Sequence, residues 1–179
     1  MTTLPTALQV ELKQTRAFRS PAEESIVAVL RTAAVMKRAW TRRIEKHGLS
    51  LAPYNVLRIL RGAGEEGLPT LAVRDRSIEE APGITRLIDK LERAHLVARA
   101  RSGEDRRTVR CIITPAGLRL LADLEPAARG AHALIEEGLP IVADQRRLLE
   151  LLAAVRAALA AEIPSPQTAP PNTKGRRTR

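Results

Sequence analysis

The sequence predicts a mainly α-helical protein that carries one small β-hairpin. Apolar residues make up 44% of the 179 residues but aromatic residues only 2%, so the core must be built from Leu, Ile, Val and Ala. That composition favours helices packed on helices. Apolar residues also recur at helical spacing over most of the chain. A short basic segment, residues 97–113, instead has the pattern of two strands joined by a turn.

Helix boundaries are clear in the first half of the chain. Residues 1–19 show no strong pattern and are expected to form a frayed extension. Ser20-Pro21-Ala22-Glu23 is typical of a helix start, with Ser as the N-cap and Pro at the first helical position. This helix is expected to cover residues 20–47, because Gly48 supplies a stop. The elements expected next are a helix from about Pro53 to Arg61, a loop at GAGEEG, residues 62–67, and a short helix from about Thr70 to Arg76.

The next helix, expected from about Pro82 to Ala94, has two distinct faces. Apolar residues stand at i, i+3, i+4 and i+7, a spacing that buries one side of a helix: Ile84, Leu87, Ile88 and Leu91. The opposite side carries small, polar and charged residues: Gly83, Thr85, Arg86, Asp89, Lys90 and Arg93. This outer side is therefore available for a partner.

A basic hairpin follows, and then two more helices. The strands are expected at about Val97–Arg101 and Thr108–Ile113. Thr114 and Pro115 predict the start of a long helix that runs past Ala133. The last helix is expected over about 144–162, with one apolar face: Leu148, Leu152, Val155 and Leu159. Residues 163–179 are rich in Pro and basic side chains, a composition typical of disorder.

Charge and element order together point to double-stranded DNA. The formal net charge of +10 suits a polyanionic partner, although a genome that favours Arg codons is an alternative explanation. A helix with a free outer face followed by a basic hairpin is the order of a winged helix-turn-helix, which enters two grooves of DNA. In this reading Thr85 and Arg86 enter the major groove, and Lys90, Arg74 and Arg101 contact phosphate.

The hairpin is expected to supply the second groove contact. Its arginines are Arg99, Arg101, Arg106, Arg107 and Arg110. Asp105 stands two residues before Arg107 and could fix the direction of that guanidinium in a bidentate pair. The alternative is a solvated basic hairpin with no role in binding.

The residues of this block resemble the MarR (multiple antibiotic resistance regulator) family of bacterial transcription factors. The matching positions, from about Gly48 to Leu124, are Tyr54 to Leu60, Thr85, Arg86, Leu87, Ile88, Asp89, Leu91, Glu92, Leu96, Val97, Arg99, Asp105, Arg107, Thr114 and Gly117. The resemblance implies a homodimer joined by the helices within 20–47 and 115–162, a DNA-binding domain over 48–114, and a palindromic operator. It implies a ligand-responsive repressor.

The resemblance further implies a small aromatic or phenolic effector. Trp40, His47 and Tyr54 are candidate lining residues for its pocket, while simple packing of Trp40 and Tyr54 is the alternative. The family usually has Gly where His95 stands, a position that needs a left-handed backbone, and Ser or Thr where Ala81 stands. Ala81 and the Glu79–Glu80 pair motivate a second hypothesis, a helical interaction protein that kept the fold but lost specific DNA binding.

Other classes of function find little support in the sequence. GAGEEG follows a helix rather than a strand, so it is not expected to bind a dinucleotide. His47, His95 and His132 lack metal-ligand spacing, and no catalytic motif is present, so neither an enzyme nor a metal or other cofactor is expected. Cys111 is the only cysteine and is expected to be a buried strand residue. No signal sequence or membrane-spanning run was found, and a cytoplasmic protein is expected.

Overall fold

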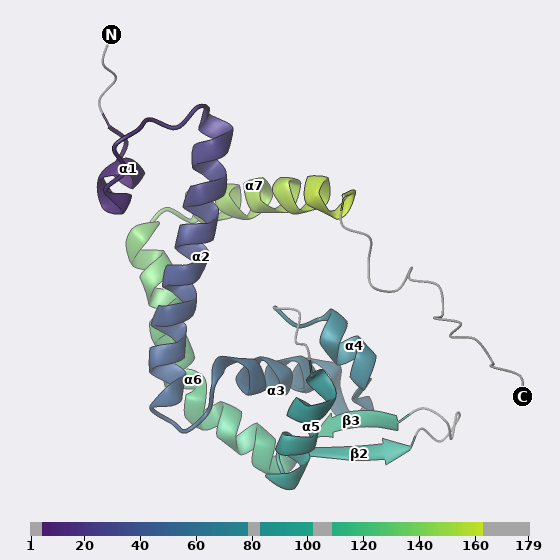
Figure 1. Ribbon diagram of the computed structural model, residues 1–179. Helices are drawn as coiled ribbons and strands as arrows, with labels where there is room; N and C mark the ends of the chain where they lie inside the picture. Colours follow the sequence, from purple (N-terminus) through teal and green to yellow (C-terminus); the bar gives the residue numbers. More distant parts are fainter. Residues whose placement is uncertain (1–4, 79–82, 102–108, 163–179) are drawn as a thin grey trace, which may run out of the picture. The chain divides into compact units, whose positions relative to one another are not determined.

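The computed structural model describes residues 5–78, 83–101 and 109–162 of the chain (Figure 1). The elements of these residues are α1 (Ala7–Leu12), α2 (Pro21–Glu45), α3 (Leu51–Ala63), the 3-10 helix η1 (Gly64–Glu66), β1 (Leu68–Pro69), α4 (Thr70–Asp75), α5 (Ile84–Arg93), β2 (Val97–Arg101), β3 (Val109–Ile113), α6 (Pro115–Gly138) and α7 (Val142–Ala160). The expected mainly helical fold with a small hairpin is confirmed. The chain divides into two compact units, Met1–Ala131 and His132–Arg179.

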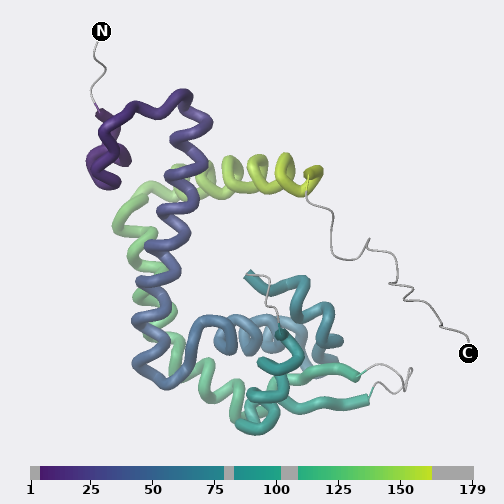
Figure 2. Tube along the Cα trace, in the orientation of Figure 1, coloured from purple at the N-terminus to yellow at the C-terminus, as the bar shows by residue number. Residues whose placement is uncertain are grey.

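Helix α2 begins where the sequence predicts. The Ser20 hydroxyl accepts a hydrogen bond from the Glu23 amide at 3.2 Å, and Pro21 occupies the first helical position. The Glu23 carboxylate in turn accepts from the Arg19 amide at 2.6 Å. The helix continues without a break to Glu45 (Figure 2), and Gly48 follows with a φ of +74°. The predicted helix over residues 20–47 is therefore confirmed to within two residues at its end.

The N-terminal segment contains a helix that the sequence analysis did not predict. The Thr6 hydroxyl accepts from the Gln9 amide at 3.3 Å, and the Gln9 side chain accepts from the Thr6 amide at 2.8 Å, which makes a reciprocal capping box at the start of α1. An ion pair of 2.7 Å between Glu11 and Arg31 links α1 to α2. Residues 7–12 are thus ordered by local caps, and the expectation of a frayed extension is wrong for this segment.

The core lies in the first unit, where α3, α4 and α5 gather beside the sheet (Figures 1 and 2). Its members are almost all aliphatic, as the composition predicts: Ile44, Tyr54, Val56, Leu57, Leu60, Leu68, Val73, Ile84, Ile88, Leu91, Val97, Cys111, Leu121, Leu124 and Ala128. The stripe predicted for α5 is confirmed. Ile84, Ile88 and Leu91 are buried, and Leu87 packs against the same core.

The sheet has three antiparallel strands in the order β1-β3-β2, one more than the sequence predicted. Val97 pairs with Ile113 and Arg101 with Val109, while Leu68 of β1 pairs with Cys111 on the other side of β3. The predicted loop at 62–67 is also partly wrong. Helix α3 continues through Ala63 and η1 follows, because nothing at Gly62 breaks the helix.

A tight junction joins the end of α5 to the start of α6. His95 has a φ of +58°, and its amide donates to the Glu92 carbonyl at 2.8 Å, while the Leu96 amide donates to the Leu91 carbonyl at 2.9 Å. These two bonds make a Schellman motif, so the expected left-handed backbone at His95 is confirmed. The Thr114 hydroxyl donates to the His95 carbonyl at 2.7 Å and accepts from the Gly117 amide at 3.1 Å.

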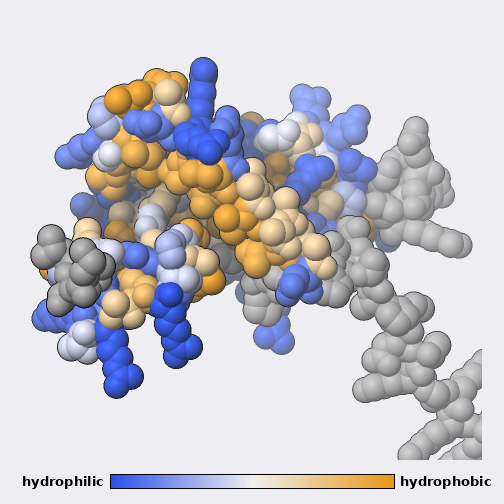
Figure 3. All heavy atoms as spheres, turned by 90° about the horizontal axis from the view of Figure 1, so that it is seen from above, coloured by the Kyte–Doolittle hydropathy of each residue, from blue (hydrophilic) through white to orange (hydrophobic). Residues whose placement is uncertain are grey.

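Helix α7 belongs to the second unit and presents apolar side chains to solvent. Within its described span no residue is buried. The large exposed apolar residues on it are Val142, Leu148, Leu149, Leu151, Val155 and Leu159. Figure 3 shows hydrophobic side chains that lie uncovered on the face turned to the viewer. The predicted tail, residues 163–179, lies outside the described residues.

Candidate nucleic-acid interface

Helix α5 presents a free outer face because its inner face is anchored in the core. Gly83 forms its N-cap with a φ of +96°, and a Cβ there would meet no atom within 4 Å. Thr85, Arg86 and Lys90 are exposed on the turns that follow. The structure therefore brings four of the predicted DNA-binding residues onto one exposed surface, with little bulk at its N-terminal end.

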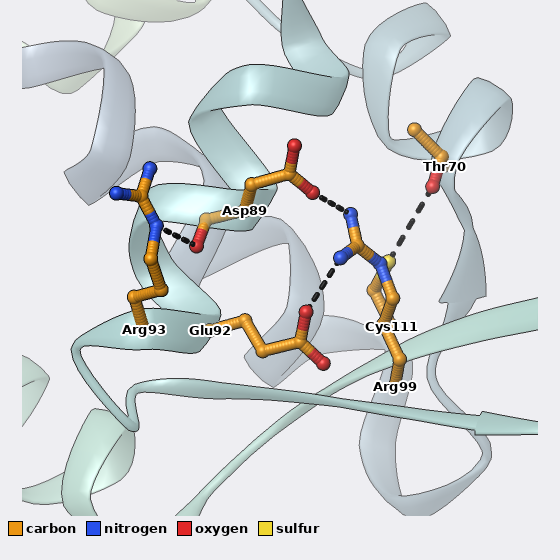
Figure 4. Close-up of polar contacts among 6 residues, drawn as sticks. All are labelled: Thr70, Asp89, Glu92, Arg93, Arg99 and Cys111. Carbon is orange, nitrogen blue, oxygen red and sulfur yellow. Dashed lines mark hydrogen bonds and ion pairs between the residues drawn. The ribbon is translucent and has the colours of Figure 1, made fainter.

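Asp89, which also belongs to the predicted outer side of this helix, has a partner within the protein. Its Oδ1 accepts a hydrogen bond from Nη2 of Arg99 at 2.5 Å, and Nη1 of Arg99 donates to the Glu92 carboxylate, also at 2.5 Å (Figure 4). The hydrogen bond with Asp89 raises the pKa of the Arg99 guanidinium, and the charge of Glu92 acts in the same direction. Arg99 therefore joins β2 to α5.

A second hairpin arginine is also bound internally. Arg110 donates from Nε to the Glu66 carbonyl at 2.7 Å and from Nη2 to the Gly67 carbonyl at 3.1 Å. The Glu66 carboxylate lies 3.9 Å from the same guanidinium but is 90% exposed, so the two backbone bonds are the stronger attachment. Arg110 thus fixes β3 to the turn before β1 instead of extending toward a partner.

Gly67 makes this attachment possible. It has a φ of +59°, and a Cβ at this position would lie 2.2 Å from the Cys111 carbonyl oxygen. The backbone of residue 67 can approach β3 this closely only because it lacks a side chain.

The remaining predicted DNA contacts fall into two groups. Arg101 is exposed at the end of β2, and Arg74 on α4 donates two hydrogen bonds to Oδ1 of Asp75, at 3.1 and 3.0 Å. Asp105, Arg106 and Arg107 lie outside the described residues. Sequence reasoning placed five arginines in the hairpin without separating Arg99 and Arg110, which are bound within the protein, from the exposed Arg101.

The candidate effector residues include one packed aromatic pair. The rings of Trp40 and Tyr54 meet edge to face with centroids 6.2 Å apart, and the Arg58 guanidinium lies 5.8 Å from the Tyr54 centroid. Tyr54 is only 5% exposed, and burial raises the pKa of its phenol despite the opposing charge of Arg58. His47 is exposed just beyond the end of α2. This geometry favours packing for Trp40 and Tyr54.

Among residues 5–78, 83–101 and 109–162, no group of three or more His, Cys, Asp or Glu side chains is placed to hold a metal ion. None of the helices in those same ranges has the length and apolar character needed to cross a membrane.

Comparison with known proteins gives the same picture. Residues 55–117 match a family model described as a winged helix DNA-binding domain. The HTH-type transcriptional regulator MhqR of Bacillus subtilis (strain 168) is 35% identical over 85 residues, which cover 48% of this chain and 57% of that protein.

Solved structures extend the similarity beyond the DNA-binding domain. CouR from Rhodococcus jostii RHA1, solved bound to p-coumaroyl-CoA, shares the fold with a TM-score of 0.63 at 23% identity, over 83% of this chain and 98% of that one. A MarR transcription factor from Planctomyces limnophilus is 38% identical, with a TM-score of 0.57 over 77% of this chain and 99% of that one. A relative this similar over nearly its whole length shows the family. The chain therefore belongs to the MarR family of transcription factors.

Proposed function

We propose that this regulator binds a specific palindromic operator as a homodimer and acts as a ligand-responsive repressor. The observation that carries the proposal is the outer face of α5, where Gly83, Thr85, Arg86 and Lys90 are exposed while the inner face is fixed in the core. A helix anchored in this way presents side chains to the major groove in a defined orientation.

Each exposed residue has a role in this proposal. Arg86 and Thr85 read or position base edges, and Lys90, Arg74 and Arg101 contact phosphate. Arg106 and Arg107, with Asp105 orienting the second of them, enter the minor groove; this part rests on the sequence alone.

Homodimer formation is supported by the apolar side chains that α2 and α7 leave exposed. Ile26 and Leu30 of α2 are 63% and 66% exposed, and Leu149 of α7 is 65% exposed. Apolar surface of this kind is typical of an interface with another chain. We propose that residues 20–47 and 115–162 join two copies and that residues 48–114 bind DNA, so that two copies of α5 face successive turns of a palindrome.

Ligand response is supported by the structural neighbour CouR, whose structure contains p-coumaroyl-CoA. We propose that a small aromatic or phenolic effector binds near Trp40, His47 and Tyr54. An effector that binds more tightly to the DNA-free form lowers DNA affinity by linkage.

The test compares DNA from upstream of the protein's own gene with an unrelated duplex over a range of salt concentrations. Specific binding is expected to exceed nonspecific binding at every salt concentration. Arg86→Ala should weaken binding to the specific duplex by about 1–3 kcal/mol and affect the unrelated duplex much less, if Arg86 contacts a base. Arg19→Ala, which removes an exposed arginine outside α5, is the matched control. Equal affinity for both duplexes at all salts would instead favour a helical interaction protein.

A further inference from the structure

The outer part of α5 carries acidic as well as basic side chains. Asp89 and Glu92 stand three residues apart, so they lie on neighbouring turns of one side of the helix. Their side chains are 43% and 38% exposed. Arg86, Lys90 and Arg93 supply three positive charges on the same helix, and these two carboxylates offset two of them. A DNA-binding helix with this composition has a net charge of only +1 (three cations and two carboxylates).

Arg99 changes this balance from a different element. It extends from β2 and donates one hydrogen bond to each carboxylate through its two terminal nitrogens, at 2.5 Å in both cases (Figure 4). Its side chain is 25% exposed, less than either carboxylate. Because the planar fork of the guanidinium is directed at Asp89 and Glu92, it is not directed at a phosphate.

The same contacts tie together the two elements that are proposed to enter adjacent grooves. Asp89 and Glu92 belong to α5, and Arg101 lies two residues after Arg99 on the strand that leads into the wing. Successive strand residues alternate in direction, so Arg99 and Arg101 are on the same side of β2. One side chain thus sets the position of the helix relative to the base of the wing.

We propose that Arg99 is a positioning residue for DNA binding: it neutralises the two carboxylates of α5 and holds this helix against β2, without contacting DNA itself. The inference rests on the proposed function, because it concerns how α5 approaches phosphate. A carboxylate left without this partner would repel the phosphates beside α5. Arg99 therefore acts on DNA affinity through Asp89 and Glu92, which makes its effect depend on their charge.

A thermodynamic cycle tests this dependence. The full-length wild type is compared with Arg99→Gln, with Asp89→Asn/Glu92→Gln, and with the triple variant, each by DNA affinity at fixed salt. Arg99→Gln should lower affinity about tenfold or more, whereas the double variant, which removes two negative charges beside DNA, should bind at least as tightly as the wild type. The triple variant should recover the part of the loss that comes from repulsion between the carboxylates and phosphate, because no carboxylate remains to be neutralised.

Arg101→Gln is the matched control on the same strand. Its loss of affinity should be the same with and without the Asp89 and Glu92 substitutions, as is expected of a residue that contacts phosphate independently. Circular dichroism and thermal unfolding establish that each variant is folded. If Arg99→Gln unfolds, Arg99→Met replaces it in the cycle, since Met also removes the charge but keeps a long apolar side chain on β2.

Two results would overturn the proposal. If Arg99→Gln bound DNA as tightly as the wild type, the contacts of Arg99 with Asp89 and Glu92 would have no role in DNA binding. A loss that adds to the effect of the double variant, without recovery in the triple variant, would show that Arg99 contacts DNA directly or acts only through folding. The affinity of each variant is also measured for an unrelated duplex at low salt. If the wild type bound both duplexes equally well, the result would count against the proposed function and not against the role of Arg99.

Discussion

His95 holds a backbone conformation that is costly for any residue with a Cβ. Its φ of +58° closes the Schellman motif at the end of α5, and its carbonyl accepts the hydrogen bond from Thr114. The side chain itself is exposed. The position therefore depends on the backbone conformation and not on imidazole chemistry.

Replacing His95 with glycine should stabilise the protein. The left-handed conformation costs a residue with a Cβ about 1–2 kcal/mol, and the greater freedom of glycine in the unfolded chain returns part of this. We expect His95→Gly to raise the free energy of unfolding by about 0.5–1 kcal/mol, measured by urea denaturation. The control is Ala94→Gly, one residue earlier, where φ is −82° and glycine should destabilise. Equal effects of the two substitutions would contradict the argument.

Tyr54 should make stability fall at alkaline pH. Burial raises the pKa of its phenol above the ordinary value of 10.0, so above this pH the unfolded chain releases a proton that the native chain keeps. The free energy of unfolding then decreases as pH rises toward the folded pKa, and is unaffected by this group at lower pH. Urea denaturation at about pH 8 and about pH 11 should show a smaller decrease for Tyr54→Phe than for the wild type. Equal decreases in the free energy of unfolding for the wild type and Tyr54→Phe would mean that folding does not change the pKa of the phenol.

At the level of elements, α6 packs against the end of α5 through a glycine. A Cβ on Gly117 would lie 2.4 Å from the Leu96 carbonyl oxygen and 2.8 Å from Cγ1 of Ile113. The backbone oxygen cannot yield easily, and the half-buried Ile113 side chain is held by its packing against the core. This contact joins the start of α6 to β3 and to the residue that precedes β2.

Gly117→Ala should therefore lower the free energy of unfolding by about 1–3 kcal/mol, the usual range for overpacking. This loss would be measured as a lower thermal unfolding temperature. The matched control lies on the same helix: at Gly130 the nearest atom to an added Cβ is Nε of Arg43 at 3.5 Å. Gly130→Ala should stabilise by up to about 1 kcal/mol through helix propensity. A neutral result at residue 117 would mean that α6 can shift without cost.

Elements with local signals could be predicted from the sequence. The start of α2 is encoded by Ser20, Pro21 and Glu23, and the span of α5 by its apolar spacing, so both were predicted closely. Helix α1 also has a local signal, the Thr6 and Gln9 capping box, which was missed because the helix is only six residues long. Strand β1 has no local signal, since its two residues are fixed only by pairing with β3.

The candidate site could be predicted only in part, for a similar reason. The exposure of Arg86 and Lys90 follows from the period of one helix. The partners of Arg99 and Arg110 do not, because they are 7 to 44 residues away in the sequence and depend on how the hairpin folds back. The distinction between structural and available arginines therefore requires the tertiary fold.

At the scale of the whole molecule, the apolar side chains of α7 should drive self-association. Val155→Glu would place an unpaired charge in the proposed interface, twice in a symmetric dimer, and should weaken self-association about tenfold or more in sedimentation equilibrium. Arg146→Gln lowers the charge by the same amount on the opposite side of the helix and should leave association unchanged. Identical behaviour of the two variants would remove this face of α7 from the interface.

Cys111 gives the DNA-binding domain a built-in kinetic reporter. It is the only cysteine of the chain, it is fully buried at the centre of the sheet, and its sulfur lies 3.6 Å from the Thr70 hydroxyl. A thiol reagent can react only after β3 separates from its neighbours, so the labelling rate measures how often this domain opens. We expect operator DNA to slow the labelling of Cys111 and Gly117→Ala to accelerate it. The labelling rate is measured by mass spectrometry. The labelling rate of this one thiol therefore reports both DNA binding and packing defects as changes in how often the domain opens.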